Sequence, residues 1–363
     1  YQYFVFQLTQ LKNMDLNNSI LLFFLISFGL FFYKYFFIFL KKYNSKILID
    51  NEFKKPQAFH EFPASTSGGL GLFFSFLILN VYFFLKGIIF YEYLSFCTLF
   101  FALGLSDDLK LNLRPKLRLI LMIIFLIGLI IFNEFYIQNT GIDFLNRFLE
   151  IDIFALFFVC LCFLFIINGS NLIDGYNGLL GVHTLIILIN LFFVNYFGSN
   201  QELSFFILFS ILSIGIFLIF NFPKATIFLG DSGSYFLGSF VAISVIKTSV
   251  DNPSISPFYF CVLLFYLFFE VFFSFIRKIV VEKKSPLFPD QNHLHMLIYK
   301  KLLKKSKNKL KSNYYVSIIL NLTYTGLILP AIFMKENGMF CKYYSIVLFI
   351  SYLFSYKMLK EKI

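Results

Sequence analysis

The sequence predicts an all-α protein that crosses a membrane many times. Its 363 residues are 59% hydrophobic and 22% aromatic, only 14% are charged, and the mean hydropathy is +0.78. The apolar residues come in runs of about 20, the length that an α-helix needs to cross the hydrocarbon core of a bilayer. A soluble domain has no use for so much apolar surface, and the sequence lacks the alternating segments of a membrane β-barrel.

Eleven apolar runs are the expected transmembrane helices. In chain order they are 19–40, 68–85, 88–105, 117–133, 152–168, 178–197, 204–221, 234–250, 257–276, 314–334 and 342–358. Met14 precedes the first run, and we interpret it as the natural start, with residues 1–13 an upstream or disordered segment. Residues 14–363 are then expected to form a single transmembrane domain, since no stretch between the runs is long enough for a separate soluble domain.

The distribution of Lys and Arg predicts the orientation, because cytoplasmic loops carry an excess of these residues. They are dense in loops 41–67, 106–118 and 277–313, whereas 133–152 carries four acidic residues and a single Arg. The basic loops are therefore expected on the cytoplasmic face, with the N-terminus outside and the C-terminus cytoplasmic. The net charge of +11 follows from this asymmetry. We interpret the basic run 300–311 as a helix that faces solvent and anionic lipids, not nucleic acid.

Polar stretches interrupt the apolar pattern, and all of them fall on the predicted cytoplasmic face. They lie in loops 41–67, 106–118, 168–178, 221–234 and 277–313. Because the orientation rests on Lys and Arg alone, this convergence independently indicates one shared site. At the ends of helices these polar side chains also avoid the roughly 2.5–3.5 kcal/mol that a charge at the bilayer centre costs.

Asp107 and Asp108 end one apolar run and begin a basic loop. Adjacent carboxylates repel each other, which raises the pKa of one of them unless a cation lies nearby. The pair therefore suits a divalent metal, a catalytic base, or both. Taken alone, an Asp-Asp pair here would more simply be a helix stop with a cap.

The segment Gly230-Asp231-Ser232-Gly233-Ser234 predicts a turn that opens a helix. Small residues expose backbone N–H groups at the positive helix terminus, where phosphate binds. Asp231 would repel phosphate unless it holds a metal, and Mg²⁺ commonly uses one or two carboxylates together with substrate phosphates. The alternative interpretation is an ordinary N-cap.

The stretch 168–178 holds four amide or carboxylate side chains and three glycines between two apolar runs, a composition typical of a ligand site. In loop 277–313, His293 and His295 are two residues apart and cannot share a helical face. This spacing favours a loop that touches phosphate over a structural zinc site. Glu270, inside the ninth run, is expected to form a structural pair with Arg277.

Together these motifs resemble the polyprenyl-phosphate N-acetylhexosamine-1-phosphate transferases of glycosyltransferase family 4, which include WecA- and TagO-like enzymes and, more distantly, the MraY translocases. The resemblance covers nearly the whole chain. It rests on Ile49-Asp50 with His60, Pro63 and Gly68-Gly69; Ser106-Asp107-Asp108 with Lys116 and Arg118; Asn168-x-x-Asn171-x-x-Asp174-Gly-x-Asn177-Gly; Asn221-x-Pro223 with Gly230 to Ser234; and Pro289-Asp290 with His293-Leu294-His295.

The resemblance implies an enzyme of the bacterial cytoplasmic (inner) membrane with its active site on the cytoplasmic face. Such an enzyme transfers N-acetylhexosamine-1-phosphate from a UDP-N-acetylhexosamine to undecaprenyl phosphate and releases UMP. The lipid-linked product would start O-antigen, teichoic acid or capsule synthesis. Mg²⁺ is the implied cofactor, with Mn²⁺ as an alternative, the lipid bilayer is a partner, and a homodimer is compatible. The identity of the sugar stays open.

The resemblance also implies roles for individual residues. Asn171 and Asp231 would bind the metal, and Asp107 and Asp108 would deprotonate or orient the lipid phosphate, in an order that stays open. The residues that would bind substrate are Lys116, Arg118, Asp174, Asn177, Gly230, Ser234, His293 and His295. Among these, Asn177 would contact the uracil.

The chain departs from the family pattern at three places. Asn177 stands where a second Asp is familiar, and Met296 follows His295 where a further His is common. The absence of three consecutive histidines argues against a MurNAc-pentapeptide substrate. The segment before Lys116 is slightly longer than expected, which leaves open whether Lys116 or Arg118 binds phosphate.

A transporter or flippase and an inactive homologue are the alternative functions. Transporter sites lie near the bilayer midplane in broken helices, whereas the polar clusters of this chain lie at one face. An inactive homologue would be expected to have lost some of Asp107, Asp108, Asn171 and Asp231, and all four are present.

Overall fold

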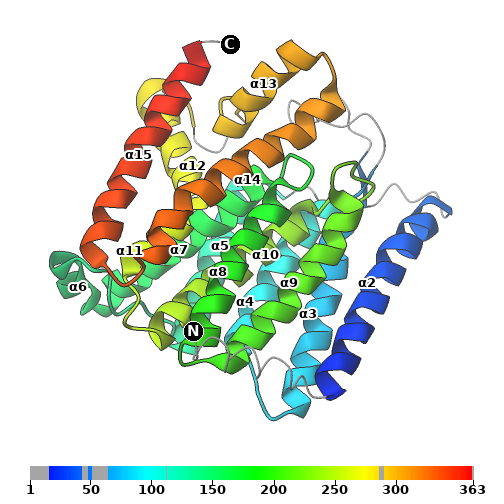
Figure 1. The fold of residues 1–363 in the computed structure, drawn as a ribbon, viewed down its shortest axis with the longest axis horizontal. Helices are drawn as coiled ribbons and strands as arrows, with labels where there is room; N and C mark the ends of the chain where they lie inside the picture. The colour runs from blue at the N-terminus through cyan, green and yellow to red at the C-terminus, as the bar shows by residue number, and fades with distance from the viewer. Residues whose placement is uncertain (1–15, 43–47, 51–63, 112, 286–289, 362–363) are drawn as a thin grey trace.

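The computed structural model describes residues 16–42, 48–50, 64–111, 113–285 and 290–361 and is almost entirely helical (Figure 1). The helices are α2 (Leu16–Lys42), α3 (Gly68–Leu85), α4 (Tyr91–Asp108), α5 (Pro115–Asn133), α6 (Asp143–Leu149), α7 (Asp152–Ile173), α8 (Leu179–Phe197), α9 (Gln201–Asn221), α10 (Gly230–Asp251), α11 (Pro257–Leu263), α12 (Phe265–Ile276), the π-helical turn η1 (Arg277–Val281), α13 (Leu294–Ser306), α14 (Lys309–Phe333) and α15 (Gly338–Glu361). Two short antiparallel strands, β1 (Ile49–Asp50) and β2 (Ala64–Ser65), form a ladder in which Ile49 lies opposite Ser65.

The prediction of an all-α polytopic membrane protein is confirmed. Within the described ranges, nine helices are long and apolar enough to cross a membrane, and the bent pair formed by α11 and α12 with η1 adds a tenth candidate. α4 corresponds to the predicted run 88–105, but its 18 residues include the acids Glu92, Asp107 and Asp108, which make it too polar to count among the nine. It nevertheless packs along α10 more extensively than any other described pair of helices.

The predicted helix 257–276 is not straight. The chain bends by 74° at the break between α11 and α12, where Leu264 ends the first helix and precedes the second. All the residues around this break are apolar or aromatic, so composition gave no sign of it. The bend places α12 and η1 on a different course from α11.

Successive long helices run in opposite directions, so their ends alternate between two faces of the bundle (Figure 1). The C-terminal ends of α4, α7 and α9 and the N-terminal ends of α5, α8 and α10 lie at the face that carries α13. The short helix α6 lies at the opposite face. The polar stretches of the sequence therefore gather at one face; that this face is cytoplasmic stays a prediction.

Glycines allow α3 and α4 to approach the start of α10 very closely. A Cβ on Gly69 would lie 2.3 Å from the backbone nitrogen of Gly233, and one on Gly104 would lie 2.3 Å from the carbonyl oxygen of Asp231. Small residues at contacts between transmembrane helices permit such backbone packing. This packing fixes the N-terminus of α10 beside the C-terminus of α4.

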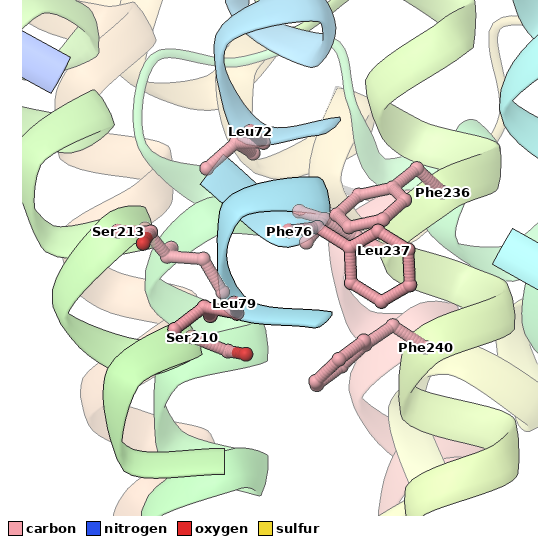
Figure 2. A pocket seen from close by; sticks show the side chains of 9 residues that line it. Leu72, Phe76, Leu79, Ser210, Ser213, Phe236, Leu237 and Phe240 are labelled. Atoms are coloured by element: carbon pink, nitrogen blue, oxygen red, sulfur yellow. The ribbon is translucent and has the colours of Figure 1, made fainter. Parts of the chain in front are cut away.

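A small recess lies deeper in the bundle, between α3, α9 and α10 (Figure 2). It is lined by Leu72, Phe76, Leu79, Ser210, Ser213, Ile214, Phe236, Leu237 and Phe240. Ser210 and Ser213 donate their hydroxyl hydrogens to carbonyl groups of their own helix, so the wall offers mainly hydrocarbon. None of the predicted site residues lines this recess.

Candidate functional site

The carboxylate of Asp108, the last residue of α4, caps the N-terminus of α10. Its Oδ1 accepts the backbone N–H of Asp231 and its Oδ2 accepts that of Ser232, each at 2.9 Å. The first N–H groups of a helix have no partner within the helix, and the positive end of the helix dipole favours an anion. Gly230 leaves room for this contact: its φ is +78°, and a Cβ there would lie 2.7 Å from Asp108 Oδ2.

Asp107 forms an ion pair with Arg118, whose guanidinium donates to Asp107 Oδ2. The same guanidinium nitrogen lies 3.5 Å from Oδ2 of Asp231, and the group also sits over the ring of Tyr235. Arg118 belongs to the first turn of α5 and therefore bridges carboxylates from α4 and α10. One cation thus offsets the repulsion between two acids at this point.

Asn171, near the end of α7, completes the cluster. Its Nδ2 donates to Asp231 Oδ1 at 2.7 Å and lies 3.0 Å from Ser234 Oγ. The Asp231 side chain is 38% exposed, so its carboxylate is open to solvent. We refer to Asp107, Asp108, Arg118, Asn171, Asp231 and Ser234 as the acidic cluster.

Asp174 lies in the polar loop after α7 and is partly buried. Burial raises the pKa of Asp174 well above its usual range, and repulsion from the carboxylates of Asp231 and Asp108 raises it further. Asp231 and Asp108 therefore act on Asp174 as nearby negative charges, and a bound cation would offset this repulsion.

Asn177 is buried and ties the polar loop to its surroundings. Its backbone N–H donates to Asn313 Oδ1 at 2.8 Å, and its carbonyl oxygen accepts from Ser317 Oγ at 2.6 Å. Its side-chain Nδ2 donates to the carbonyl of Pro223 at 2.8 Å. Three parts of the chain are joined at this residue, which gives it a structural role beside the predicted contact with uracil.

Lys116 does not enter the acidic cluster. It is exposed at the start of α5, and it makes no ion pair with the residues that the structure describes. Arg118, two positions later, points to the carboxylates instead. Of the two residues that the sequence left open, Arg118 is the one that the fold brings to the acids.

The two histidines of loop 277–313 form a second polar group. Their rings are stacked, with centroids 5.4 Å apart and planes 5° apart. His293 Nδ1 lies 3.0 Å from Glu270 Oε1, and His295 Nδ1 lies 3.2 Å from the hydroxyl of Tyr266. Burial lowers the pKa of His295 to about 3, so this ring is neutral at physiological pH.

The expected pair between Glu270 and Arg277 is wrong. The α-helix ends at Ile276 and Arg277 begins the π-helical turn η1, and other partners take both charges. Arg277 instead pairs with Asp290 and lies 3.5 Å from Glu282. Glu270 accepts from His293, from the backbone of Leu294 and from Tyr352. The sequence did not predict a role for Tyr352. The one signal that pointed to such a partner was Glu270, an acid within an apolar run.

The polar stretch 168–178, which forms the end of α7 and the loop after it, connects the two groups. Tyr176 packs its ring against the ring of His295, with centroids 5.7 Å apart. Asp174, two residues earlier, is repelled by the carboxylates of Asp231 and Asp108 in the acidic cluster. Residues of α4, α5, α7, α10 and α13 therefore meet on one face of the bundle. His60, Pro63 and Pro289, which the sequence analysis also named, and residues 1–13 lie outside the described residues.

In the part of the chain that the structure describes, no group of three or more His, Cys, Asp or Glu side chains is arranged to hold a metal. A site for Mg²⁺ needs fewer protein side chains, because this ion keeps several waters and binds through one or two carboxylates and the phosphates of a substrate. The exposed carboxylate of Asp231 fits such a site, and Asn171, whose Nδ2 donates to that carboxylate, would offer its amide oxygen to the same ion.

Fold and site together define an α-helical membrane protein with several transmembrane helices and a cluster of acids, an amide and an arginine at one face. A comparison with protein families adds a similarity to this description. Residues 90–249 match the family described as glycosyl transferase family 4. This segment holds every member of the acidic cluster.

Curated relatives agree with this result. The chain is 30% identical over 203 residues to an undecaprenyl-phosphate alpha-N-acetylglucosaminyl 1-phosphate transferase of Thermotoga maritima, an alignment that covers 56% of this chain and 59% of the relative. It is 30% identical over 198 residues to a probable undecaprenyl-phosphate N-acetylglucosaminyl 1-phosphate transferase of Bacillus subtilis, covering 53% and 54%. A phospho-N-acetylmuramoyl-pentapeptide-transferase of Dictyoglomus turgidum is 34% identical over 186 residues, covering 48% and 58%. The chain thus matches less than two thirds of the length of each relative.

Proposed function

We propose that this protein transfers N-acetylhexosamine-1-phosphate from a UDP-sugar to undecaprenyl phosphate. A phosphate oxygen of the lipid attacks the β-phosphorus of the UDP-sugar, the bond between that phosphorus and the bridging oxygen breaks, and UMP leaves. The product is a lipid pyrophosphoryl sugar. The names of the Thermotoga maritima and Bacillus subtilis relatives support this reaction and make UDP-N-acetylglucosamine the first donor to test.

The observation that carries the proposal is the meeting of Asp107, Asp108 and Asp231 around Arg118 and Asn171 at the ends of their helices. Phosphoryl transfer depends mainly on positioning and on neutralising charge. A lipid phosphate lies at the membrane surface, which is where the ends of transmembrane helices lie. The site is therefore placed where a membrane-bound phosphate and a water-soluble nucleotide can meet.

Mg²⁺ is the proposed cofactor, held by Asp231 and Asn171 together with water and substrate phosphates. When bound, it would supply positive charge that stabilises phosphate oxygens during transfer. The exposed carboxylate of Asp231 and the repulsion that Asp231 and Asp108 exert on Asp174 support a divalent cation at this place.

Asp107 and Asp108 have different surroundings, which supports different roles. Both oxygens of Asp108 accept backbone N–H groups of α10, so this residue holds the N-terminus of α10 in place. Asp107 pairs with a side chain that can move, Arg118. We infer that Asp107 is the carboxylate that deprotonates or orients the lipid phosphate, and that Arg118 turns toward the phosphates when substrate binds.

The active-site face is proposed to be cytoplasmic, because the Lys and Arg residues gather on the face of the acidic cluster. The bacterial cytoplasmic (inner) membrane is proposed because the relatives are bacterial proteins. UDP-sugars then reach the site from the cytoplasm. His293, His295 and Asn177 are proposed to contact the nucleotide sugar, and the glycan that the product starts stays open among O-antigen, teichoic acid and capsule.

The proposal is tested by UMP release from the purified protein with undecaprenyl phosphate, Mg²⁺ and a panel of UDP-N-acetylhexosamines. We expect UMP with one donor and only when lipid and metal are both present. Folded protein that binds UDP yet releases no UMP with any donor would point to a chain that has kept the fold and lost the reaction.

A further inference from the structure

Glu270 of α12 and Tyr352 of α15 form a buried connection to His293. We propose that these two residues are positioning residues that fix the ring and the tautomer of His293 for the transfer reaction. The inference rests on the proposed function as far as activity is concerned. The orientation and tautomer of the His293 ring do not depend on the proposed function.

The Glu270 carboxylate is only 1% exposed and each of its oxygens is engaged. Oε1 lies 3.0 Å from His293 Nδ1 and accepts the backbone N–H of Leu294 at 3.1 Å. Oε2 accepts the hydroxyl of Tyr352 at 2.6 Å. A buried carboxylate is tolerated only when donors satisfy it, and these three donors come from the histidine loop, the start of α13 and α15.

This arrangement determines which nitrogen of His293 carries the hydrogen. An ionised carboxylate can only accept hydrogen bonds, so the hydrogen of a neutral His293 ring must sit on Nδ1, between the ring and Glu270. Nε2 is then left for another partner. It lies 3.9 Å from Asp290 Oδ2, a carboxylate already paired with Arg277. Nε2 is therefore the atom that His293 can offer to a substrate.

Glu270 also fixes the position of the histidine motif as a whole. Leu294 is the first residue of α13, and its N–H is one of the groups that the helix leaves without an internal partner. A single carboxylate thus holds both the ring of His293 and the first turn of the helix that carries His295. Partners that orient a functional histidine in this way commonly matter about tenfold or more for activity.

Tyr352 connects α15 to the candidate site through its hydrogen bond to Glu270. This helix lies outside residues 90–249, the segment that matches the family. One turn further along α15, the hydroxyl of Tyr356 accepts from Arg277 at 2.6 Å. The last helix of the chain therefore supports both Glu270 and Arg277 through two tyrosine hydroxyls, although it holds none of the residues predicted to bind substrate.

The first test compares two single-hydroxyl deletions on the same helix. Tyr352→Phe removes the donor to Glu270, and Tyr344→Phe removes a hydroxyl that donates to the carbonyl of Leu327 at 2.7 Å, away from the site. We expect Tyr352→Phe to lower kcat for UMP release roughly tenfold, and Tyr344→Phe to match the wild type. In a His293→Gln background, Tyr352→Phe should cause no further loss, because the residue acts through His293.

The second test needs no activity. The chain has four histidines, so ¹⁵N-histidine labelling with a His293→Gln variant identifies the resonances of His293. We expect the Nδ1–H tautomer in the wild type, in Tyr344→Phe and in Tyr352→Phe, since Glu270 still accepts there, but with shifted His293 resonances in Tyr352→Phe because Glu270 has lost one donor. Glu270→Gln, whose amide can donate as well as accept, should give a mixture of tautomers.

The two tests separate this inference from the proposed function. Wild-type protein that releases no UMP contradicts the proposed function, while the tautomer of His293 still decides the positioning role. Tyr352→Phe that matches Tyr344→Phe in spectrum, or whose loss of kcat is undiminished in the His293→Gln background, overturns the inference.

Discussion

Asp108 at the end of α4 accepts the backbone N–H of Asp231 at the start of α10, at 2.9 Å. The residues are 123 positions apart in the sequence, and this contact joins the two most polar helix ends of the site. It places the exposed Asp231 carboxylate beside Arg118 and Asn171. The arrangement of the acidic cluster depends on this contact.

Replacing Asp108 with Asn should destabilise the protein by about 1–2 kcal/mol, the usual cost of losing a helix cap. The amide has one acceptor oxygen in place of two, so one N–H of α10 would face an NH₂ group. Thermal unfolding in detergent measures the change. Asp143→Asn, an exposed acid in the first turn of α6, is the control and should stay close to wild type; equal effects of the two substitutions would argue against the cap.

Gly230→Ala should cost about 1–3 kcal/mol, because the residue has a φ of +78° and the new Cβ would lie 2.7 Å from Asp108 Oδ2. The matched control is Gly215→Ala in α9, where a Cβ would meet no atom within 4 Å and where alanine favours the helix. Denaturation of both variants checks the prediction. A Gly230→Ala protein as stable as Gly215→Ala would show that Asp108 has room to move.

Arg118→Ala should lower kcat for UMP release about 100-fold or more, the typical effect of removing a group that stabilises charge in a transition state. Lys116→Ala, which removes an exposed residue of the same helix turn, should leave kcat within about threefold. Parallel assays of the two purified variants decide between the residues. The reverse ranking would mean that Lys116 reaches the phosphates and that Arg118 only holds Asp107.

The stability of the protein should fall as the pH drops below 6.5, in part because of His295. Burial lowers the pKa of His295 from 6.5 to about 3, so between these values the unfolded chain binds a proton that the native protein does not. Stability is therefore lost as pH falls through this window, by up to about 1.4 kcal/mol per pH unit for one such group. Unfolding at pH 7.5 and pH 5.5 should show a smaller loss for His295→Gln than for wild type; equal losses would mean that His295 becomes protonated within the folded protein.

Much of the site could be predicted because its residues carry chemistry in short local motifs. Asp107-Asp108, Asn171 and Gly230 to Ser234 stand out against apolar runs, and the bundle brings them together. The contacts that sequence analysis missed join distant positions: Tyr352 reaches Glu270 across 82 residues and Asn313 reaches Asn177 across 136. A tyrosine or asparagine in a helix looks the same whether it faces lipid, core or site, so one sequence gives no signal for these pairs.

The interpretation of Glu270 shows a related limit. Glu270 and Arg277 are opposite charges on one face of a predicted helix, which made a direct pair a reasonable expectation. The helix gives way to a π-helical turn at Arg277 and the following loop returns with His293 and Asp290. Residues of that loop lie closer and pair with both charged side chains. These partners can be identified only from the three-dimensional structure.

In the proposed reaction the sugar moves together with its phosphate, at the acidic cluster. The most direct measurement uses UDP-N-acetylglucosamine labelled with ³²P in the β-phosphate, undecaprenyl phosphate and Mg²⁺, with wild-type protein and Asp231→Asn. We expect that the label enters the lipid fraction while unlabelled UMP is released, and that Asp231→Asn abolishes this transfer. Label that remains in UDP while the sugar enters the lipid, or full transfer by Asp231→Asn, would contradict it.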